Sequence, residues 1–308
     1  MTNNKKIDGK LISSTLKDWI RSEVINLLDQ GKIIPNLAVI LVGDNPASKV
    51  YVKSKSKTAQ KLGIGISDYY LPSNTSQKDL EALIEKLNND SLINGILLQL
   101  PLPDHLDTSS LLSKINPDKD VDALTPFNAG RLVSGKPRLV PCTPLGSHIL
   151  IKSRLRELSG INAVVIGRSL LFGKPMGQIL LLENSTVTMT HSRTKNIKEY
   201  CKKADLIVVA VGRPEMVDSS WVNKNSIIID VGINRVNLED GSYKITGDVN
   251  FDSVYREVKA VTPVPGGVGP MTIACLMFNT LVATQIQNTI SPFPWNELHT
   301  KLNMKNSN

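Results

Sequence analysis

Short apolar runs alternate with helical stretches along most of the chain, and this alternation constrains the fold more than any other feature. The runs expected to form strands are Leu37–Gly43, Asn94–Pro103, Ala163–Ile166, Thr186–Thr190, Leu206–Val211 and Ile227–Val231. Buried strands that alternate with helices indicate parallel sheets covered by helices on both faces. The 308 residues suffice for roughly two domains of ~150 residues, so the predicted fold class is α/β with two domains.

Two segments rich in proline and glycine divide this pattern. Pro137–Pro144 is expected to break any helix, and Pro263–Pro270 is too rich in both residues for a regular element. The apolar stretch Met271–Ala283 falls short of the ~18 residues that suggest a membrane span, so we expect a buried helix and no membrane association. After Ile290 we expect a loosely held C-terminal tail over 291–308.

The charge balance and the cysteines limit the partners and the compartment. Lys and Arg number 36 and Asp and Glu 28, a net charge of +8, which favours anionic partners such as a phosphate-bearing cofactor, an acidic metabolite or nucleic acid. The three cysteines are scattered with no Cys-x-x-Cys pair, so a disulfide framework and a thiolate zinc site are not expected. No apolar segment follows the charged start, so we read no secretory signal and expect a reducing, cytoplasmic location.

A metal site is not predicted either. Asp118, Asp120 and Asp122 mimic the start of a calcium loop, but Ala123 occupies the position that requires glycine and Ala129 that of the bidentate glutamate. The four histidines show no ligand spacing.

The turn after the strand Ala163–Ile166 is a candidate phosphate-binding turn. Gly167 is followed by Arg168 and Ser169, and then by Gly173 at the expected start of a helix. Such a turn exposes backbone N–H groups at the positive end of a helix, where a pyrophosphate can bind. The usual G-x-G-x-x-G spacing is absent, so a tight turn without a ligand remains an alternative.

The end of the next strand indicates which dinucleotide would bind. Enzymes that use NAD usually carry Asp or Glu there for the ribose 2′-hydroxyl, whereas this chain has His191, Ser192 and Arg193. A cationic end rich in donors suits a 2′-phosphate, so we expect NADP. A further strand tip, Ile229–Asn234, is typical of a segment that lines a cofactor site.

The helix expected over Lys49–Leu62 carries one lysine in an unusual place. At about 100° per residue, Lys53 and Lys57 share a charged stripe, whereas Lys55 falls on the apolar side with Tyr51 one turn before it. Burial disfavours the charged form of a lysine, which suits acid–base chemistry. The alternative is a lysine that extends its amine to solvent from the edge of that face. Gln99 is a second unusual residue, because it interrupts an otherwise apolar strand.

Taken together, these segments resemble the bifunctional methylenetetrahydrofolate dehydrogenase/cyclohydrolase family. The matching segments are Tyr51-Val-Lys-Ser-Lys55, Gly95–Pro103, Pro117–Asp122, Gly167–Ser169, Gly173–Pro175, Thr186–Thr188 with His191 and Ser192, Asp230–Asn234, Gly247–Val249 and Thr262–Thr272. They follow the family's order over about residues 5–287, and the string Pro-Gly-Gly-Val-Gly-Pro-Met-Thr is highly specific.

The resemblance implies a fold and an activity. It implies a catalytic folate-binding domain over 1–147 plus 272–290, a Rossmann-like NADP-binding domain over 148–271, and a C-terminal helix that returns to the first domain. It implies NADP-dependent oxidation of 5,10-methylenetetrahydrofolate to the methenyl form, followed by hydrolysis to 10-formyltetrahydrofolate. The substrate is then a folate, polyglutamylated or not, and the chain is expected to form a homodimer.

The resemblance also assigns residues. It implies that Lys55 is the catalytic lysine, Tyr51 stacks on the substrate, Gln99 tunes the lysine and Asp122 binds the pterin. The expected substrate-binding residues are Tyr51, Lys55, Leu98, Gln99, Leu100, Asp122 and the loop Pro265, Gly266, Gly267, Val268, Gly269, Pro270, Met271, Thr272 and Ile273. The expected cofactor-binding residues are Gly167, Arg168, Ser169, Ser192 and Ile233.

The chain departs from the family pattern at three positions, and two other functions are alternatives to the one that the resemblance implies. Ala123 replaces a usual glycine beside Asp122, Phe172 replaces a smaller residue, and Asn250 replaces a common aspartate. One alternative is a dehydrogenase that has lost hydrolysis, against which the intact lysine and glutamine argue. The other is a basic module that binds nucleic acid through the lysines of 49–61, which no nucleic-acid-binding motif accompanies.

Overall fold

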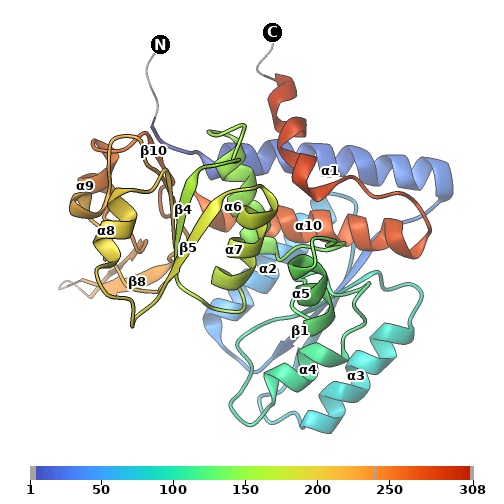
Figure 1. The fold of residues 1–308 in the computed structure, drawn as a ribbon. Coiled ribbons are helices and arrows are strands. Elements are labelled where there is room, and N and C mark those ends of the chain that lie inside the picture. Colours follow the sequence, from blue (N-terminus) through green and yellow to red (C-terminus); the bar gives the residue numbers. More distant parts are fainter. Residues whose placement is uncertain (1–4, 239–240, 306–308) are drawn as a thin grey trace. The chain divides into compact units, whose positions relative to one another are not determined.

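The computed structural model describes residues 5–238 and 241–305, and the chain divides into two compact units. The five-stranded unit comprises the described residues of Met1–Ser14, Thr143–Thr272 and Leu302–Asn308. The three-stranded unit comprises Thr15–Cys142 and Ile273–Lys301. Both units are parallel α/β structures (Figure 1), which confirms the predicted fold class.

The sheet of the three-stranded unit has the order β2-β1-β3, with all strands parallel. Its strands are β1 (Asn36–Val42), β2 (Gly65–Leu71) and β3 (Gly95–Leu98), and its helices include α2 (Pro46–Lys61), α3 (Gln77–Asn89), α4 (Thr108–Lys114) and α5 (Pro126–Val133). Central β1 is buried beyond its first residue, as its unbroken apolar run predicts. Helix α2 begins where Asn45 accepts a hydrogen bond from the Ser48 N–H and Pro46 fixes the first turn.

The five-stranded sheet has the order β10-β7-β6-β4-β5, again all parallel. Its strands are β4 (Asn162–Ile166), β5 (Thr186–Thr190), β6 (Leu206–Val209), β7 (Ile227–Asp230) and β10 (Ala260–Val261). The same unit holds α6 from Thr143 onward, α7 (Gly173–Leu182), α8 (Ile197–Lys202), α9 (Phe251–Tyr255), the short helix η1 (Ser219–Trp221) and an antiparallel pair, β8 (Asn234–Asn237) with β9 (Tyr243–Thr246). Strand β4 lies between β5 and β6, so the order of the strands reverses there.

Both proline-rich segments begin helices, contrary to the sequence prediction. Helix α6 (Cys142–Lys152) contains Pro144, and helix α10 (Val268–Gln287) contains Pro270. Each proline lies in the first turn, where its missing N–H would have no helical partner in any case. The predicted loop from Pro265 to Ile273 is therefore irregular only up to Gly267.

Helix α10 is longer than the apolar stretch suggested. It spans 20 residues and is long and apolar enough, by length and composition, to cross a membrane, but 72% of its most apolar window is buried inside the protein. Its residues from Ile273 onward belong to the three-stranded unit, as expected for a helix that returns to the first domain. Helix α1 (Gly9–Gly31) likewise begins in one unit and continues in the other.

The C-terminal segment is not loosely held throughout. The short helix η2 (Trp295–Lys305) buries Leu298 completely, and the ring of Phe293 packs edge-on against Trp19 at 5.2 Å between centroids. These apolar contacts hold the segment after Ile290, and the prediction of a loose tail is wrong for this part.

Candidate active site

Lys55 and Gln99 meet at the carboxyl edge of the three-stranded sheet. Lys55 lies on α2, the helix that follows β1, and its side chain is only 9% exposed. Its Nζ donates a 2.9 Å hydrogen bond to Gln99 Oε1. Gln99 comes directly after β3 rather than inside it, and its backbone N–H bonds to Ile40 O. The apolar strand that we predicted is thus shorter, and the glutamine marks its end.

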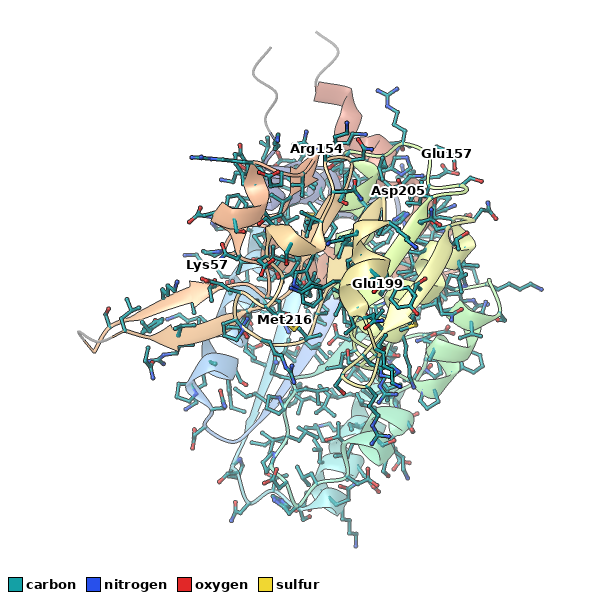
Figure 2. The ribbon with its side chains drawn as sticks, turned by 60° about the vertical axis from the view of Figure 1, so that its left-hand side comes forward. Lys57, Arg154, Glu157, Glu199, Asp205 and Met216 are labelled. Carbon is teal, nitrogen blue, oxygen red and sulfur yellow. The ribbon has the colours of Figure 1, made fainter. Side chains whose placement is uncertain are left out.

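The periodicity of α2 placed its lysines correctly. Lys53 is exposed, and so is Lys57 (Figure 2), whereas Lys55 is buried. Tyr51 lies one turn before Lys55 and is 43% exposed, so part of the residue is accessible to a ligand. None of the ion pairs within residues 5–238 and 241–305 involves Lys55.

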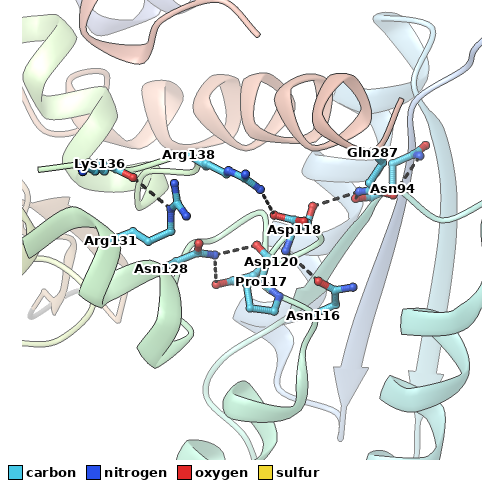
Figure 3. Close-up of polar contacts among 10 residues, drawn as sticks. All are labelled: Asn94, Asn116, Pro117, Asp118, Asp120, Asn128, Arg131, Lys136, Arg138 and Gln287. Carbon is cyan, nitrogen blue, oxygen red and sulfur yellow. Dashed lines mark hydrogen bonds and ion pairs between the residues drawn. The ribbon is translucent and has the colours of Figure 1, made fainter. Parts of the chain in front are cut away.

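Asp122 is carried by a loop that runs alongside β3. Asp120 forms a parallel bridge with Ile96, so the loop and the strand proceed toward the same edge. Asp120 is 1% exposed, and its carboxylate accepts hydrogen bonds from Leu124 N and Thr125 N. It also accepts one from Asn128 Nδ2 (Figure 3). Burial raises the pKa of Asp120, and these donors oppose the shift. Sequence reasoning considered Asp120 only as part of a false calcium loop and missed this anchoring role.

Helix α10 supports the same loop from another direction. Asn279, which is buried, donates from Nδ2 to Val121 O at 2.7 Å and to Val140 O at 2.8 Å. Gln287 donates from Nε2 to Asn94 O and Asp118 O (Figure 3). Val121, the residue before Asp122, is therefore fixed by the side chain of Asn279, which is far away in the sequence.

Cys142 lies beside the backbone that carries Asp122, and its thiol donates to Val121 O at 3.3 Å. Burial raises the pKa of the Cys142 thiol well above its usual value, and the charge of Asp122 adds to this shift. The charge of Lys55 acts on the same thiol in the opposite direction. The structure therefore joins Lys55 to Gln99 by a hydrogen bond and places Cys142, which the sequence analysis had not assigned to the site, against Val121, the residue before Asp122.

Ala123 adopts a backbone conformation that favours glycine. Its φ is +54°, in the left-handed region where a Cβ costs roughly 1–2 kcal/mol. This departure from the family pattern therefore places backbone strain in the residue after Asp122. Leu98 is buried at the end of β3 and Leu100 is half-buried beyond it.

The five-stranded sheet gathers the expected cofactor residues at its own carboxyl edge. In register, Ile166 of β4 pairs with Thr190 of β5 and Val209 of β6, and Val209 pairs with Asp230 of β7. The segments that follow these four strand ends contain Gly167 to Ser169, Ser192 and Ile233. Ligands of parallel α/β sheets bind at this edge.

The turn after β4 suits a dinucleotide. Gly167 has φ +121°, and a Cβ there would lie 2.3 Å from Ala210 O; a Cβ on Gly173 would lie 2.3 Å from Gly167 O. Both glycines are thus required by close backbone approach. Ser169 Oγ accepts hydrogen bonds from Phe172 N and Gly173 N at the start of α7, while Arg168 is exposed beside it.

The turn after β5 and the tip after β7 are exposed. His191 N bonds to Thr194 Oγ1 and Arg193 N to His191 Nδ1, which leaves Ser192 and Arg193 at the surface. Ile233 is 53% exposed. These two turns contain no carboxylate in residues 191–194 or 231–234, so the residues present fit a 2′-phosphorylated dinucleotide.

Two departures from the family pattern have simple structural outcomes. Phe172 is 5% exposed, so its bulk is packed inside the unit. Asn250 accepts from Ser253 N and caps α9, a role in which asparagine and aspartate are equivalent.

The segment Pro265–Thr272 is held by the start of α1 within the five-stranded unit. Lys10 N bonds to Gly266 O, and Ser13 Oγ donates to Pro270 O. A Cβ on Gly9 would lie 1.9 Å from Gly267 O, so the two backbones touch. Among the described residues no group of three or more His, Cys, Asp or Glu side chains could hold a metal ion.

The five-stranded parallel sheet has a glycine turn where its strand order reverses, which is typical of dinucleotide binding. The chain also buries a lysine at the edge of a second parallel sheet, which is typical of an active site. Together these features define the class of dinucleotide-binding α/β enzymes. The chain matches the catalytic domain of tetrahydrofolate dehydrogenase/cyclohydrolase over residues 7–122 and its NAD(P)-binding domain over residues 141–288. It therefore belongs to the tetrahydrofolate dehydrogenase/cyclohydrolase family, which confirms the resemblance seen in the sequence.

Similar proteins extend over nearly the whole chain. The bifunctional protein FolD of Paramagnetospirillum magneticum is 50% identical over 283 residues, which is 92% of this chain and 96% of the relative. The bifunctional protein FolD 2 of Sinorhizobium medicae is 51% identical over 286 residues, with 92% and 96% covered.

Solved structures agree. The Campylobacter jejuni FolD bifunctional enzyme superposes with a TM-score of 0.87 at 45% identity, covering 91% of this chain and 98% of the other. The Trypanosoma brucei enzyme, solved with NADP and an inhibitor, superposes with a TM-score of 0.85 at 35% identity. The match covers 92% of this chain and 98% of the other.

Proposed function

We propose that this chain oxidises 5,10-methylenetetrahydrofolate to 5,10-methenyltetrahydrofolate with NADP and hydrolyses the product to 10-formyltetrahydrofolate. The observation that carries the proposal is the hydrogen bond from buried Lys55 Nζ to Gln99 Oε1, in a chain of this family. Both activities agree with the matched family domains and with the bifunctional relatives.

Oxidation needs position rather than a general base. When bound, NADP accepts a hydride from the one-carbon bridge of the folate. The contribution of the chain is to hold the reacting groups close together. Arg168, Ser169 and Ser192 hold the phosphate-bearing part of the cofactor at the edge of the five-stranded sheet, where cationic and hydroxyl donors suit phosphate.

Folate binding uses the three-stranded unit. The pterin carries a 2-amino group and a ring N–H, a pair of donors that the Asp122 carboxylate accepts together. Asp120 and Asn279 fix the loop so that this carboxylate keeps its direction. Tyr51 offers its half-exposed side chain to the flat substrate, and Leu98 and Leu100 belong to the same unit. The family resemblance adds residues 265–273 to the expected binding set.

Hydrolysis adds water to a cationic amidinium carbon, so a proton must leave the water. The bond from this carbon to N5 then breaks and N5 takes up a proton, which leaves the formyl group on N10. The amine of Lys55, in its neutral form, takes the proton of the water and does not repel the cationic substrate. Gln99 orients the amine through a neutral oxygen. A carboxylate in its place would hold the lysine protonated, which would remove the base.

We further propose that the enzyme is a cytoplasmic homodimer that accepts polyglutamylated folates. The three cysteines are buried and free, which suits a reducing compartment, and the net charge of +8 suits an anionic substrate tail. Light scattering of the purified chain tests the dimer, and KM values for mono- and polyglutamylated folate test the substrate preference.

Two spectrophotometric assays test the function. Oxidation of methylenetetrahydrofolate is followed with NADP and with NAD, and hydrolysis of methenyltetrahydrofolate is followed without either. We expect both reactions, with NADP preferred in the first. Oxidation without hydrolysis would support the alternative of a dehydrogenase alone, and steeply salt-dependent DNA binding without either reaction would support a nucleic-acid-binding module.

A further inference from the structure

Asp248 accepts four hydrogen bonds from two segments that are separate in the sequence, the loop after β6 and the first residue of β8. It lies in the Gly247-Asp248-Val249 segment after β9, and its side chain is fully buried. Oδ2 accepts from Val211 N at 2.7 Å and Gly212 N at 3.0 Å. Oδ1 accepts from Arg213 N at 2.8 Å and from Asn234 Nδ2 at 2.8 Å.

These donors belong to the carboxyl edge of the five-stranded sheet. Val211 to Arg213 follow β6, which ends at Val209, and Asn234 follows β7, which ends at Asp230. Beyond the strand ends the backbone N–H groups of the first loop have no sheet partner, and the carboxylate supplies one. A buried charge in turn requires such donors, so carboxylate and loops stabilise each other.

A second buried carboxylate fixes the first. Asp230, at the end of β7, accepts from Gly232 N, Asp248 N and Val249 N, each at 3.0 Å. Burial, together with the charge of Asp248, raises the pKa of Asp230 to about 7, and the three N–H groups oppose this shift. The backbone that carries Asp248 is thereby tied to the strand next to β6.

Two glycines make this close arrangement possible. A Cβ on Gly247 would lie 1.8 Å from Asp230 Oδ2, and a Cβ on Gly232 would lie 2.4 Å from Asp248 Cγ. No side chain fits at either position without moving a carboxylate. Gly232 directly precedes Ile233, so the residues on both sides of Ile233 are held: Asp230 accepts from the backbone N–H of Gly232, and Asp248 accepts from the side-chain amide of Asn234.

We propose that Asp248 is a positioning residue for the dinucleotide: it fixes the loops after β6 and β7 in the conformation that receives the nicotinamide half. In doubly wound sheets a dinucleotide extends across the reversal of strand order, which lies at β4. The β4–β5 side carries the residues suited to the 2′-phosphate, so the β6–β7 side faces the other half. This inference rests on the proposed function.

The test compares Asp248→Asn with the parent chain. Either orientation of the asparagine amide places an NH2 group against N–H donors, so the loops lose at least two bonds. We expect the Kd for NADPH, measured by fluorescence titration, and the KM for NADP to rise about 10- to 100-fold, the scale of lost charge-assisted bonds. Hydrolysis of methenyltetrahydrofolate, which uses no dinucleotide, should stay within about twofold of the parent. Amide hydrogen exchange of residues 211–213 in the cofactor-free chain should accelerate.

Two further variants keep the test decisive. Asp252→Asn removes an exposed carboxylate on α9 and should leave binding, exchange and both activities unchanged. Asn234→Ala removes one of the four hydrogen bonds to Asp248 and should raise the NADPH Kd roughly threefold. If Asp248→Asn does not fold, this variant tests the inference in its place.

The outcomes separate the inference from the proposed function. A parent chain that binds no NADPH overturns the proposed function, whatever the exchange of residues 211–213. A parent that binds NADPH, with Asp248→Asn binding it equally well, overturns the inference alone. Hydrolysis that falls as far as dinucleotide binding would show a general structural role and would overturn it too.

Discussion

Lys55 Nζ donates to Gln99 Oε1 at 2.9 Å while Gln99 Nε2 donates to Leu100 O at 2.6 Å. The second bond fixes the amide, so its oxygen is directed at the lysine. The arrangement gives the amine a neutral acceptor, and no carboxylate in the described part of the chain forms an ion pair with it. Such an amine is oriented without an ion pair that would favour its charged form.

Lys55→Met should separate the two reactions. Methionine keeps much of the stem's bulk and removes the amine, so hydrolysis loses its proton acceptor while hydride transfer loses only positioning. We expect hydrolysis to fall by ~10²-fold or more, the usual scale for a general base, and oxidation to fall less. Methenyltetrahydrofolate should then accumulate during turnover with NADP, which absorbance measures directly.

Lys53→Met is the matched control on the same helix. Lys53 is exposed, so both activities should stay nearly at the parent level. Hydrolysis at the parent rate in Lys55→Met, or its loss in Lys53→Met, would contradict the role that we assign to the buried face of α2.

Gln99→Glu should impair hydrolysis through the lysine. The new carboxylate would lie at hydrogen-bond distance from Nζ, and an opposite charge that close favours the protonated amine. We expect hydrolysis to fall by roughly 10-fold or more and its pH optimum to move upward, because more alkaline solution is needed to free the base. A pH–rate profile that coincides with the parent's would refute this coupling.

Asp122→Asn should weaken both reactions, because both need the pterin to be held. An amide in place of the carboxylate leaves one of two desolvated donors mispaired, at roughly 2–5 kcal/mol. KM for folate and both rates measure the loss. Asp118→Asn is the control: Asp118 pairs with Arg138 at 3.1 Å on the surface, and such a pair contributes at most about 1 kcal/mol. Normal folate binding by Asp122→Asn would reject the assignment.

Arg168→Ala should shift the preference between cofactors. Arg168 is exposed beside the glycine turn, and the turn after β5 carries no acidic residue. Loss of a charge-assisted contact with the 2′-phosphate costs ~1.5–3 kcal/mol, so KM for NADP should rise more than KM for NAD. Arg156→Ala, at an exposed arginine before β4, should change neither. Equal losses for the two cofactors would show that Arg168 does not read the 2′-phosphate.

Local patterns in the sequence predicted the strands and the buried face of helix α2, because these features depend on residues close together in the chain. The apolar runs of β4 and β5 matched their observed bounds to within one residue, and helical periodicity separated buried Lys55 from exposed Lys53. Strand β2 was missed because it is an edge strand whose residues are half-buried or exposed, so it lacks the continuous apolar run of its neighbour.

Contacts between distant segments were not predictable from one sequence. Asn279 interrupts an apolar helix, and nothing near it in the sequence indicates that it holds Val121 and Val140. The same is true of Asp248, whose four donors lie in two other segments. The proline-rich segments were misjudged because proline is unfavourable inside a helix but acceptable in its first turn.

Glu183 supplies a prediction on acid stability. It follows α7, and its carboxylate bonds to His148 Nε2 and to Lys152 Nζ, both on α6, at 3.0 Å each. Burial alone would raise the pKa of Glu183, but these two partners outweigh it and lower the pKa to about 2. A carboxyl whose folded pKa is depressed stabilises the fold above its unfolded value of about 4.5, and this contribution disappears as pH falls toward 2.

Glu183→Gln should therefore lower the free energy of unfolding at pH 7 by about 2–3 kcal/mol, less than the ~3–5 kcal/mol of a fully buried broken pair because the site is partly open to water. Urea unfolding of the parent and the variant at pH 7, 5, 4 and 3 measures the difference. We expect it to be constant above about pH 5 and to shrink steadily below pH 4.5, because the unfolded parent then takes up a proton on Glu183 while the folded parent keeps its carboxylate ionised until the pH approaches 2. Glu199→Gln, at an exposed carboxylate on α8 (Figure 2), should show a difference near zero at every pH. A Glu183→Gln deficit that stays the same from pH 7 to pH 3 would mean that the glutamate stabilises α6 and α7 by packing rather than by its charge.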